Sequence, residues 1–459
     1  MTFFHFLPIA FDAWRMRHAS SEQIAQRQQK RLSDLVTFAR TYSPFYAEKY
    51  RTLPDIVTDI RQLPPVTKVE LMEHFDDVIT DPTVHRIDVE KFLDNKNTIG
   101  RRFLDRYMVW TTSGTTGTPG IFLEDQNWDT VLSAVNLTRI GLEWYTPDVI
   151  RGMVKGGGIT AAVFAGNGHF LGVSMIKRQS FNHSSRAKSK HLIPITLPIP
   201  EIVQHLNELQ PVMFSGYASA LTLLAYEQLS GRLNIHPSIV VSSAEPLTDE
   251  NRALIQRAFG VPPRNNYSCS EGGVMAYECR QGKMHLNIDW ILFEPVDENY
   301  NPVSIGQTSN RVLITNLANR VMPIIRYELS DRASLEPEPC SCGITLPVVK
   351  VEGRSDEILY FENANGQNIP VLPLALWAVI KEIPGVLRFQ AIKISPYALK
   401  IRLETINSET DADIWHMVQI QVQDFFQKQS LSNVEIFRAQ EGPMRDPKSG
   451  KFRNVWSEY

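Results

Sequence analysis

The sequence has few cysteines and no excess of charge of either sign. Only four of its 459 residues are cysteine, too few for a disulfide framework, so we expect a cytoplasmic protein whose thiols stay reduced or bind metal. The formal net charge of −3 argues against a broad basic surface for nucleic acid. No apolar run is long enough to span a membrane and no basic leader opens the chain, so we expect neither a membrane partner nor a signal peptide.

Length and patterning indicate an α/β protein of more than one domain. The chain is long for a single core, and 43% of its residues are hydrophobic. Residues 20–50 have helical periodicity and predict a surface helix that runs into a turn at residues 42–44. Further on, strand-like and helix-like segments alternate, at 193–199, 201–209, 212–214, 218–229 and 238–242. This alternation predicts an α/β fold, with mixed or parallel sheets flanked by helices.

The pattern changes after residue 353. Residues 399–404 alternate between apolar and charged, as in a half-buried strand, and 434–437 predict a second strand. Between them, Asp411 is placed to cap an amphipathic helix. We therefore expect a large domain over residues 1–353 and a small α+β domain over residues 354–459.

The loop at residues 111–120 is rich in threonine and glycine and follows an apolar run at 107–110. Glycines allow backbone N–H groups to converge, and hydroxyls add donors, which suits a polyphosphate. The loop differs from the common phosphate-binding motif, because Pro119 stands where that motif has its second glycine. A polar surface turn is the alternative interpretation.

Six short motifs occur in one order along the chain: TTSGTTGTPG (111–120), SSAEPLT (242–248), YSCSE (267–271), RYELSD (326–331), GRSDEI (353–358) and PKSGK (447–451). This order resembles the adenylate-forming superfamily, which includes acyl- and aryl-CoA ligases, nonribosomal adenylation domains and luciferases. Within it, the phenylacetate–CoA ligase-like branch is most similar. The segments SPFYAEKY and LPPVTKVEL also resemble that branch, so the likeness covers nearly the whole chain.

The resemblance implies a site for ATP and Mg²⁺. The residues it assigns to the nucleotide are Ser113, Gly114, Thr115, Thr116 and Gly117 at the β- and γ-phosphates, Ala244, Glu245 and Tyr267 around the adenine, Asp331 at the ribose, and Arg354 near the domain junction, with Ser268 and Ser270 as further nucleotide-binding residues. The implied catalytic residues are Thr115, Glu271 and Lys451. Glu271 would hold Mg²⁺, and Lys451 would stabilise charge between the carboxylate and the α-phosphate. Asp356 falls at the hinge of the family.

Each residue also has a simpler explanation when it is taken alone. Tyr267 can be an ordinary half-buried tyrosine, Asp331 can form an ion pair with Arg326, and Lys451 can be a solvated lysine. The chain also departs from many relatives at Gly120, where a lysine would place a cation beside the pyrophosphate. The order of the motifs, rather than any one residue, favours the nucleotide site.

Four metal-binding side chains fall in two pairs, Cys279 with His285 and Cys340 with Cys342. Three thiolates and an imidazole suit a tetrahedral, structural Zn²⁺ site. Against this, the two halves are about 55 residues apart, and the alternative is four unlinked side chains. Cys269, within YSCSE, is expected to line the nucleotide site instead.

The resemblance implies an ATP-dependent ligase that activates a small carboxylic acid as an acyl-adenylate and then transfers the acyl group to a thiol, with coenzyme A as the expected acceptor. Residues 156–158 and 213–217 are candidates for an acyl pocket that suits an aryl or medium apolar acid. Two alternatives stay open. The acceptor can be the phosphopantetheine of a free-standing carrier protein or an amine, or the chain can be a nucleotide-binding regulatory protein that has lost the chemistry.

Overall fold

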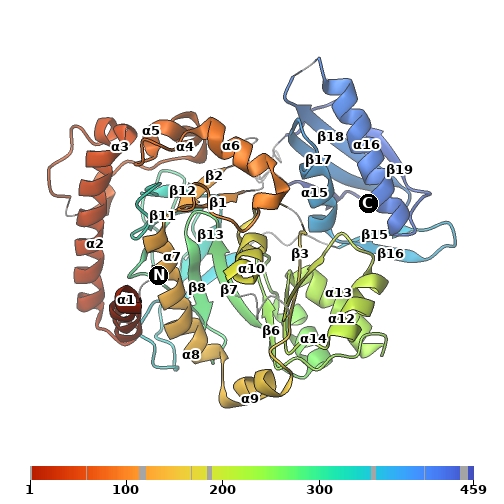
Figure 1. Cartoon of the computed structure of the whole chain (residues 1–459), viewed down its shortest axis with the longest axis horizontal. Helices are drawn as coiled ribbons and strands as arrows, with labels where there is room; N and C mark the ends of the chain where they lie inside the picture. Colours follow the sequence, from red (N-terminus) through yellow and green to blue (C-terminus); the bar gives the residue numbers. More distant parts are fainter. Residues whose placement is uncertain are drawn as a thin grey trace.

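The computed structural model describes residues 3–57, 59–112, 120–166, 168–182, 189–352, 358–407, 409–444 and 453–459. Over these ranges the chain is a mixed α/β protein in which several sheets are flanked by helices (Figure 1). None of the helices in these ranges has the length and apolar character needed to cross a bilayer.

The α-helices of the described ranges are α1 (Phe3–Met16), α2 (Ser21–Tyr42), α3 (Pro44–Lys49), α4 (Lys68–Glu73), α5 (Phe75–Val78), α6 (Arg86–Asp94), α7 (Gln126–Val135), α8 (Gly141–Trp144), α9 (Pro147–Lys155), α10 (Leu171–Asn182), α12 (Ile199–Leu209), α13 (Ala218–Leu229), α14 (Asp249–Phe259), α15 (Pro373–Lys381) and α16 (Asp411–Lys428). Short 3₁₀ turns are η1 (Ile60–Gln62) and η2 (Lys96–Thr98), and η3 (Asn136–Ile140) is a π-helical turn that joins α7 to α8.

The strands of the same ranges are β1 (Met108–Thr111), β2 (Ile121–Glu124), β3 (Thr160–Phe164), β4 (Lys190–Pro194), β5 (Met213–Gly216), β6 (Ile239–Ser242), β7 (Arg264–Cys269), β8 (Gly273–Glu278), β9 (Met284–Leu286), β10 (Ile291–Val296), β11 (Arg311–Asn316), β12 (Tyr327–Leu329), β13 (Arg332–Leu335), β14 (Val349–Glu352), β15 (Leu359–Glu362), β16 (Asn368–Val371), β17 (Val386–Ser395), β18 (Ala398–Thr405), β19 (Glu435–Arg438) and β20 (Val455–Ser457).

The largest sheet has seven strands in the order β4-β3-β5-β6-β7-β8-β9. Neighbours from β4 to β7 are parallel, and β8 and β9 add antiparallel strands. Parallel neighbours need crossover connections, which α12, α13 and α14 provide. The interior strand β5 buries Phe214 completely, so this member of the expected acyl pocket belongs to the core instead.

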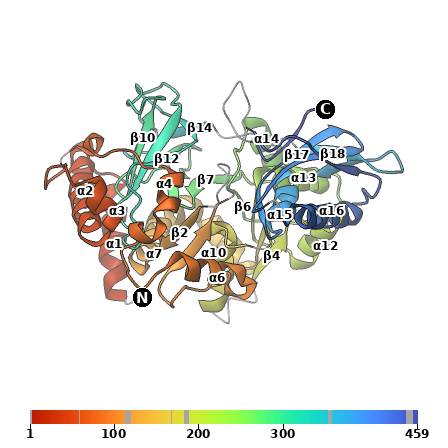
Figure 2. The ribbon, with the colours of Figure 1, turned by 90° about the horizontal axis from the view of Figure 1, so that it is seen from above.

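The C-terminal part of the chain forms a four-stranded sheet in the order β19-β18-β17-β20, together with α15 and α16. It lies on the side of α12 and α13, away from α1–α3 (Figures 1 and 2). The Phe170 and Trp377 rings are 5.3 Å apart, and Gln429 donates a 3.1 Å hydrogen bond to the Thr196 carbonyl. These contacts join the C-terminal elements to the large sheet. The expected boundary at 353/354 and the hinge at Asp356 lie outside the described residues and stay predictions.

The helical segment over 20–50 is divided in the turn expected at residues 42–44, where the Ser43 side chain caps α3 and Pro44 favours a new first turn. Two other local expectations were imprecise. The strand expected over 193–199 ends at Pro194, since a proline cannot donate to the sheet. Asp411 does not cap α16: its carboxylate accepts hydrogen bonds from Thr405 and Arg438, which compete for it.

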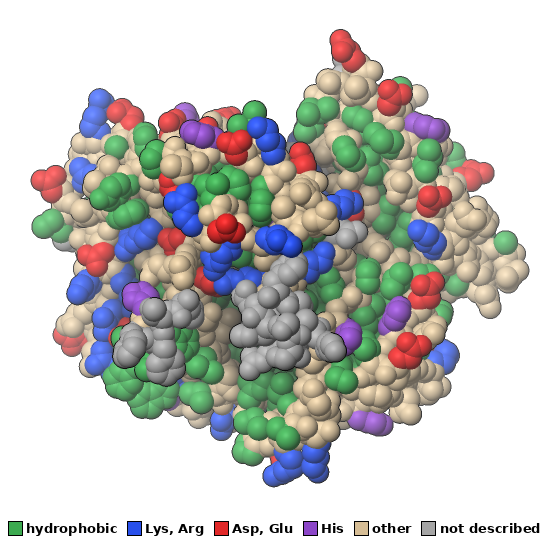
Figure 3. All heavy atoms as spheres, in the orientation of Figure 1, with side chains coloured by type: hydrophobic (Ala, Val, Ile, Leu, Met, Phe, Trp, Pro, Cys, Tyr) green, Lys and Arg blue, Asp and Glu red, His purple; other side chains and the backbone are tan. Residues whose placement is uncertain are grey.

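Both signs of charge occur on the face shown in Figure 3, and Lys and Arg side chains gather near its centre, between α6 and α10. Arg102 and Arg178 of α10 both pair with the buried Asp129, which compensates part of the charge of these two side chains.

Candidate functional site

A cavity of about 780 Å³ opens among the loops that follow β6 and β12 and the start of α15. Five residues assigned to the nucleotide from the sequence line it: Ala244, Glu245, Tyr267, Ser268 and Asp331. They come from three separate segments of the chain. The structure thus brings the adenine and ribose candidates onto one cavity.

Tyr267 and Asp331 both line this cavity and contact each other directly. The Tyr267 hydroxyl, at the end of a side chain on β7, donates a 2.7 Å hydrogen bond to Asp331 Oδ2. Burial and the negative charge of Asp331 hold the pKa of Tyr267 well above its ordinary value, so the phenol stays a donor. Arg326 is not the partner of Asp331, because its guanidinium pairs with Glu294 at 3.1 Å.

The segment after β6 has an uncommon backbone conformation. Ala244 has a φ of +65°, in the left-handed region that residues with a side chain rarely adopt. The next residue, Glu245, accepts hydrogen bonds from the backbone N–H of Ser219 at 2.7 Å and from its hydroxyl at 3.0 Å. Glu245 therefore binds the first turn of α13 and holds the strained segment against the cavity.

Glu271 is buried in the turn between β7 and β8, next to the half-buried Ser270. Tyr327 donates a 3.1 Å hydrogen bond to Glu271 Oε1. Burial raises the pKa of Glu271. The Glu271 carboxylate is buried, yet no Lys or Arg of the described ranges forms an ion pair with it. A buried carboxylate with unused oxygen lone pairs fits a hard divalent cation such as Mg²⁺.

The base of the Thr/Gly-rich loop is closed by two hydrogen bonds. The Thr112 N–H donates to the Gly120 carbonyl, and the Gly120 N–H donates to Thr112 Oγ1, both at 3.0 Å. A Cβ at Gly120 would lie 2.5 Å from the Phe122 ring and 2.8 Å from Thr112 Oγ1. A side chain at this position would therefore require the Phe122 ring and the Thr112 hydroxyl to shift.

Several candidates lie outside the described residues, so their roles stay predictions. They are Ser113, Gly114, Thr115, Thr116 and Gly117 in the loop, Arg354 and Asp356 near the expected domain junction, and Lys451 in the C-terminal motif.

The four candidate zinc ligands form one cluster, in which all ligand atoms lie within 4.8 Å of one another. Cys279 Sγ and Cys340 Sγ are 3.9 Å apart, and Cys342 Sγ is 3.3 Å from His285 Nε2. A tetrahedral zinc with bonds of about 2.3 Å to sulfur separates two thiolates by about 3.8 Å. His285 Nδ1 is 2.7 Å from the Leu346 carbonyl, an acceptor that leaves Nε2 facing the sulfurs. The arrangement fits Zn²⁺.

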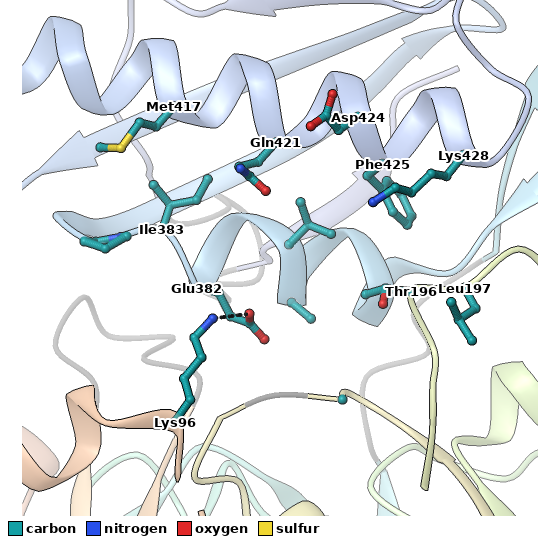
Figure 4. A pocket seen from close by; sticks show the side chains of 14 residues that line it. Lys96, Thr196, Leu197, Glu382, Ile383, Met417, Gln421, Asp424, Phe425 and Lys428 are labelled. Carbon is teal, nitrogen blue, oxygen red and sulfur yellow. Dashed lines mark ion pairs between the residues drawn. The ribbon is translucent and has the colours of Figure 1, made fainter. Parts of the chain in front are cut away.

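A second cavity of about 450 Å³ lies between α15, α16 and the segment after β4 (Figure 4). Lys96 and Glu382 form a 3.6 Å ion pair at one side of it, and Asp424 and Lys428 line the other. None of the described candidate residues lines this cavity, so it is separate from the proposed nucleotide site.

Two curated proteins resemble the chain in sequence, whereas no protein-family model matches it. CapK of Staphylococcus aureus is 24% identical over 324 residues, which cover 68% of this chain and 63% of CapK. Phenylacetate-coenzyme A ligase of Pseudomonas putida is 28% identical over 173 residues, 36% of this chain and 38% of that protein. The chain thus spans less than two thirds of either relative.

Solved structures resemble the chain over almost its whole length. The alignment with a 2-hydroxyisobutyryl-CoA ligase in complex with 2-HIB-AMP and CoA covers 96% of this chain and 91% of the ligase chain. The identity is 19% and the TM-score is 0.59. The same ligase in the postadenylation state gives a TM-score of 0.54 at 18% identity. The chain has the adenylate-forming fold. The expected α/β class and the resemblance to the phenylacetate–CoA ligase-like branch are both confirmed.

Within this adenylate-forming fold, the structure adds residues that the motifs did not indicate. Tyr327 binds Glu271, Ser219 binds Glu245, and Leu374 of α15 lines the nucleotide cavity. Tyr327 lies inside the motif RYELSD, so its position was available as a signal. Ser219 and Leu374 carry no such signal, because their role depends on contacts between distant segments.

Proposed function

We propose that the chain is an AMP-forming acid–thiol ligase. In the first step a carboxylate oxygen attacks the α-phosphorus of ATP, the bond to the β-phosphate breaks, and pyrophosphate leaves. In the second step a thiolate attacks the acyl carbonyl, the bond to the phosphate breaks, and AMP leaves. The observation that carries this proposal is the shared cavity of Ala244, Tyr267 and Asp331 in an adenylate-forming fold.

The residues of the site have distinct proposed tasks. Asp331 accepts hydrogen bonds from the ribose hydroxyls, and Tyr267 lies against the adenine while it orients the Asp331 carboxylate. Glu271 would hold Mg²⁺, which neutralises phosphate charge when bound. Lys451 would bring an ammonium between the carboxylate and the α-phosphate, where it stabilises the transition state more than the ground state.

The acid is proposed to be aryl or medium apolar, and coenzyme A is the proposed thiol. Both ligases that the chain resembles, phenylacetate-coenzyme A ligase and 2-hydroxyisobutyryl-CoA ligase, support coenzyme A as the thiol, and the first of them supports an aryl acid. Transfer to a carrier-protein phosphopantetheine or to an amine is the alternative acceptor chemistry. A regulatory protein that binds nucleotide without turnover is a further alternative.

We also propose that residues 354–459 act as a lid with a hinge near Asp356, and that the four-residue cluster binds a structural Zn²⁺. Reduced thiols at Cys279, Cys340 and Cys342 support a cytoplasmic location. Acid-dependent exchange of labelled pyrophosphate into ATP tests the first half-reaction, and product analysis with coenzyme A, a carrier protein or amines then identifies the acceptor.

A further inference from the structure

The outer face of α1 carries a stripe of large apolar side chains. Leu7, Phe11 and Trp14 stand at positions i, i+4 and i+7 of the helix, so they lie on one side of it. They are 46%, 62% and 47% exposed, and the rings of Phe11 and Trp14 are 5.8 Å apart. Single exposed apolar residues are common, whereas a contiguous group of them marks a surface that binds a partner.

Contacts on the inner face hold α1 in place. Ala10 and Ala13 are buried, and the Ala13 carbonyl accepts a 3.3 Å hydrogen bond from the buried Arg139 of η3. Just after the helix, the Arg17 carbonyl accepts a 2.9 Å hydrogen bond from the N–H of Thr345. The helix lies on the outside of the molecule, at the end away from the C-terminal sheet (Figures 1 and 2). The stripe is therefore a fixed part of the folded surface.

Basic side chains border the stripe at the end of α1. Arg15, with 56% of its side chain exposed, lines a hollow of about 290 Å³ between α1 and α2, together with Arg27 and Lys30. Asp12 is shared between two of them, at 2.7 Å from Arg27 and 3.6 Å from Arg15. Lys30 forms no ion pair within the described ranges. The hollow therefore has more positive than negative charge.

The sequence around this hollow is basic, although the chain as a whole is not. Residues 3–42 contain six Lys or Arg and three Asp or Glu, whereas the formal net charge of the whole chain is −3. An apolar face that holds Trp and Phe and is flanked by cations is typical of an amphipathic helix that lies in the interface of an anionic bilayer. Such a helix needs no spanning segment. The lack of a spanning run, from which we expected no membrane partner, does not exclude this kind of contact.

A second copy of the chain fits the stripe less well than a bilayer does. The three side chains expose on the order of 300 Å², against about 800 Å² that each partner buries in a stable dimer. A symmetric dimer through α1 would also bring two hollows of excess positive charge toward each other. A surface of anionic lipids instead neutralises that charge and accepts the apolar rings.

We propose that α1 docks the protein on the surface of a bilayer that contains anionic lipids. The stripe enters the boundary between headgroups and acyl chains, and the cations of the hollow bind lipid phosphates. Because Arg15 directly follows Trp14, one flat surface can contact both the stripe and the hollow. None of these residues lines the nucleotide cavity, so docking and the proposed ligase reaction are separate properties of the molecule.

Sedimentation of the full chain with lipid vesicles tests this docking. Vesicles of phosphatidylcholine and phosphatidylglycerol in equal amounts supply the anionic surface, and vesicles of phosphatidylcholine alone are the neutral comparison. We expect the wild type to bind the anionic vesicles and to bind the neutral ones about tenfold more weakly or less. High salt should weaken the binding to anionic vesicles, because it screens the charges of the hollow.

Two variants separate the stripe from the hollow. Phe11→Ser and Lys30→Glu should each weaken binding to anionic vesicles by about tenfold or more, through lost apolar area and lost attraction respectively. The matched controls are Phe437→Ser, at a 44% exposed ring on β19, and Lys91→Glu, at an exposed lysine of α6. Both controls should change the binding by less than about twofold. All four side chains are exposed, so the melting temperature should stay nearly the same.

Wild-type protein that stays in solution with anionic vesicles would overturn the proposal. Equal binding to neutral and anionic vesicles, or equal losses in Phe11→Ser and Phe437→Ser, would also overturn it. A wild-type dimer that Phe11→Ser converts to a monomer in lipid-free sedimentation, without vesicle binding, would assign the stripe to a second copy instead. Pyrophosphate exchange without vesicles should be the same in the wild type and in Phe11→Ser. If no acid supports exchange, the ligase function fails while the vesicle test still decides the docking.

Discussion

The Tyr267 hydroxyl donates a 2.7 Å hydrogen bond to the Asp331 carboxylate, and both side chains line one cavity. The bond occupies one lone pair of a carboxylate that has about four acceptor sites. Asp331 therefore keeps acceptors for two ribose hydroxyls, with its orientation fixed by a phenol that does not ionise.

Asp331→Asn keeps the shape of this side chain and removes its charge. We expect the KM for ATP to rise by about ten- to a hundredfold, because charge-assisted hydrogen bonds to the ribose become neutral ones. Steady-state kinetics with ATP as the varied substrate measures the effect. Glu328→Gln is the matched control, since Glu328 also accepts a hydrogen bond from a tyrosine hydroxyl, that of Tyr300, but does not line the cavity. Equal effects of the two substitutions would refute the ribose role of Asp331.

Lys451→Ala is expected to lower the rate of adenylate formation by about a hundredfold or more, because the ammonium acts on charge that develops in the transition state. Thioester formation from a supplied acyl-adenylate is expected to change by about threefold at most, since that step does not pass through the same transition state. Single-turnover assays of the two half-reactions measure both rates. Equal loss in both assays contradicts the assignment of Lys451.

Metal analysis of the purified chain is expected to find about one zinc per molecule, held by the cluster around His285. Cys342→Ser removes a ligand, so both the metal content and the melting temperature should fall. Cys269→Ser is the control, because Cys269 lies outside the cluster and contacts Met275. A wild-type protein that holds only traces of zinc at full activity and stability would refute the site.

Glu124 predicts a pH dependence of stability. Burial raises the pKa of this carboxyl from its ordinary 4.5 to about 8, and the nearby indole N–H groups of Trp110 and Trp128 oppose the shift only in part. The fold favours the protonated form. The stability from this group is therefore complete below its ordinary pKa and is lost as the pH rises toward 8.

Glu124→Gln mimics the protonated form at every pH. We expect the variant and the wild type to have similar free energies of unfolding at pH 5. At pH 8.5 we expect the free energy of unfolding of the variant to be higher by about 3 kcal/mol. Denaturant unfolding at the two pH values measures the difference. Glu48→Gln, at a side chain with 73% exposure, provides the control and should change neither value. A variant that is less stable than the wild type at pH 8.5 would show that the ionised carboxylate belongs to the fold.

Local sequence patterns predicted the parts of the molecule that depend on local chemistry. Alternating strands and helices indicated the α/β class, and the order of the motifs indicated the fold. The two pairs of candidate zinc ligands also come together as expected: Cys279 follows β8 and His285 lies on β9, beside Cys340 and Cys342. Their metal still has to be measured.

The features that sequence analysis missed depend on contacts between distant segments. Val66, which precedes α4, pairs with Tyr327 across some 260 residues. The local sequence predicted that Asp411 caps the helix after it, but Arg438 binds the Asp411 carboxylate instead. Glu124 was not singled out in the sequence, and the packing around β2 buries it. Such environments exist only after the chain has folded.

Acid-dependent exchange between labelled pyrophosphate and ATP tests the central claim most directly. The wild-type chain is incubated with ATP, Mg²⁺, pyrophosphate and a panel of aryl and medium-chain acids. The proposed function predicts exchange that requires one class of acid and does not require coenzyme A. Exchange should need more ATP in the Asp331→Asn variant, and it should be about a hundredfold slower or more in the Lys451→Ala variant. Exchange no higher than the acid-free background for every acid, in a folded protein that binds ATP, would contradict the ligase function and favour a regulatory nucleotide-binding protein.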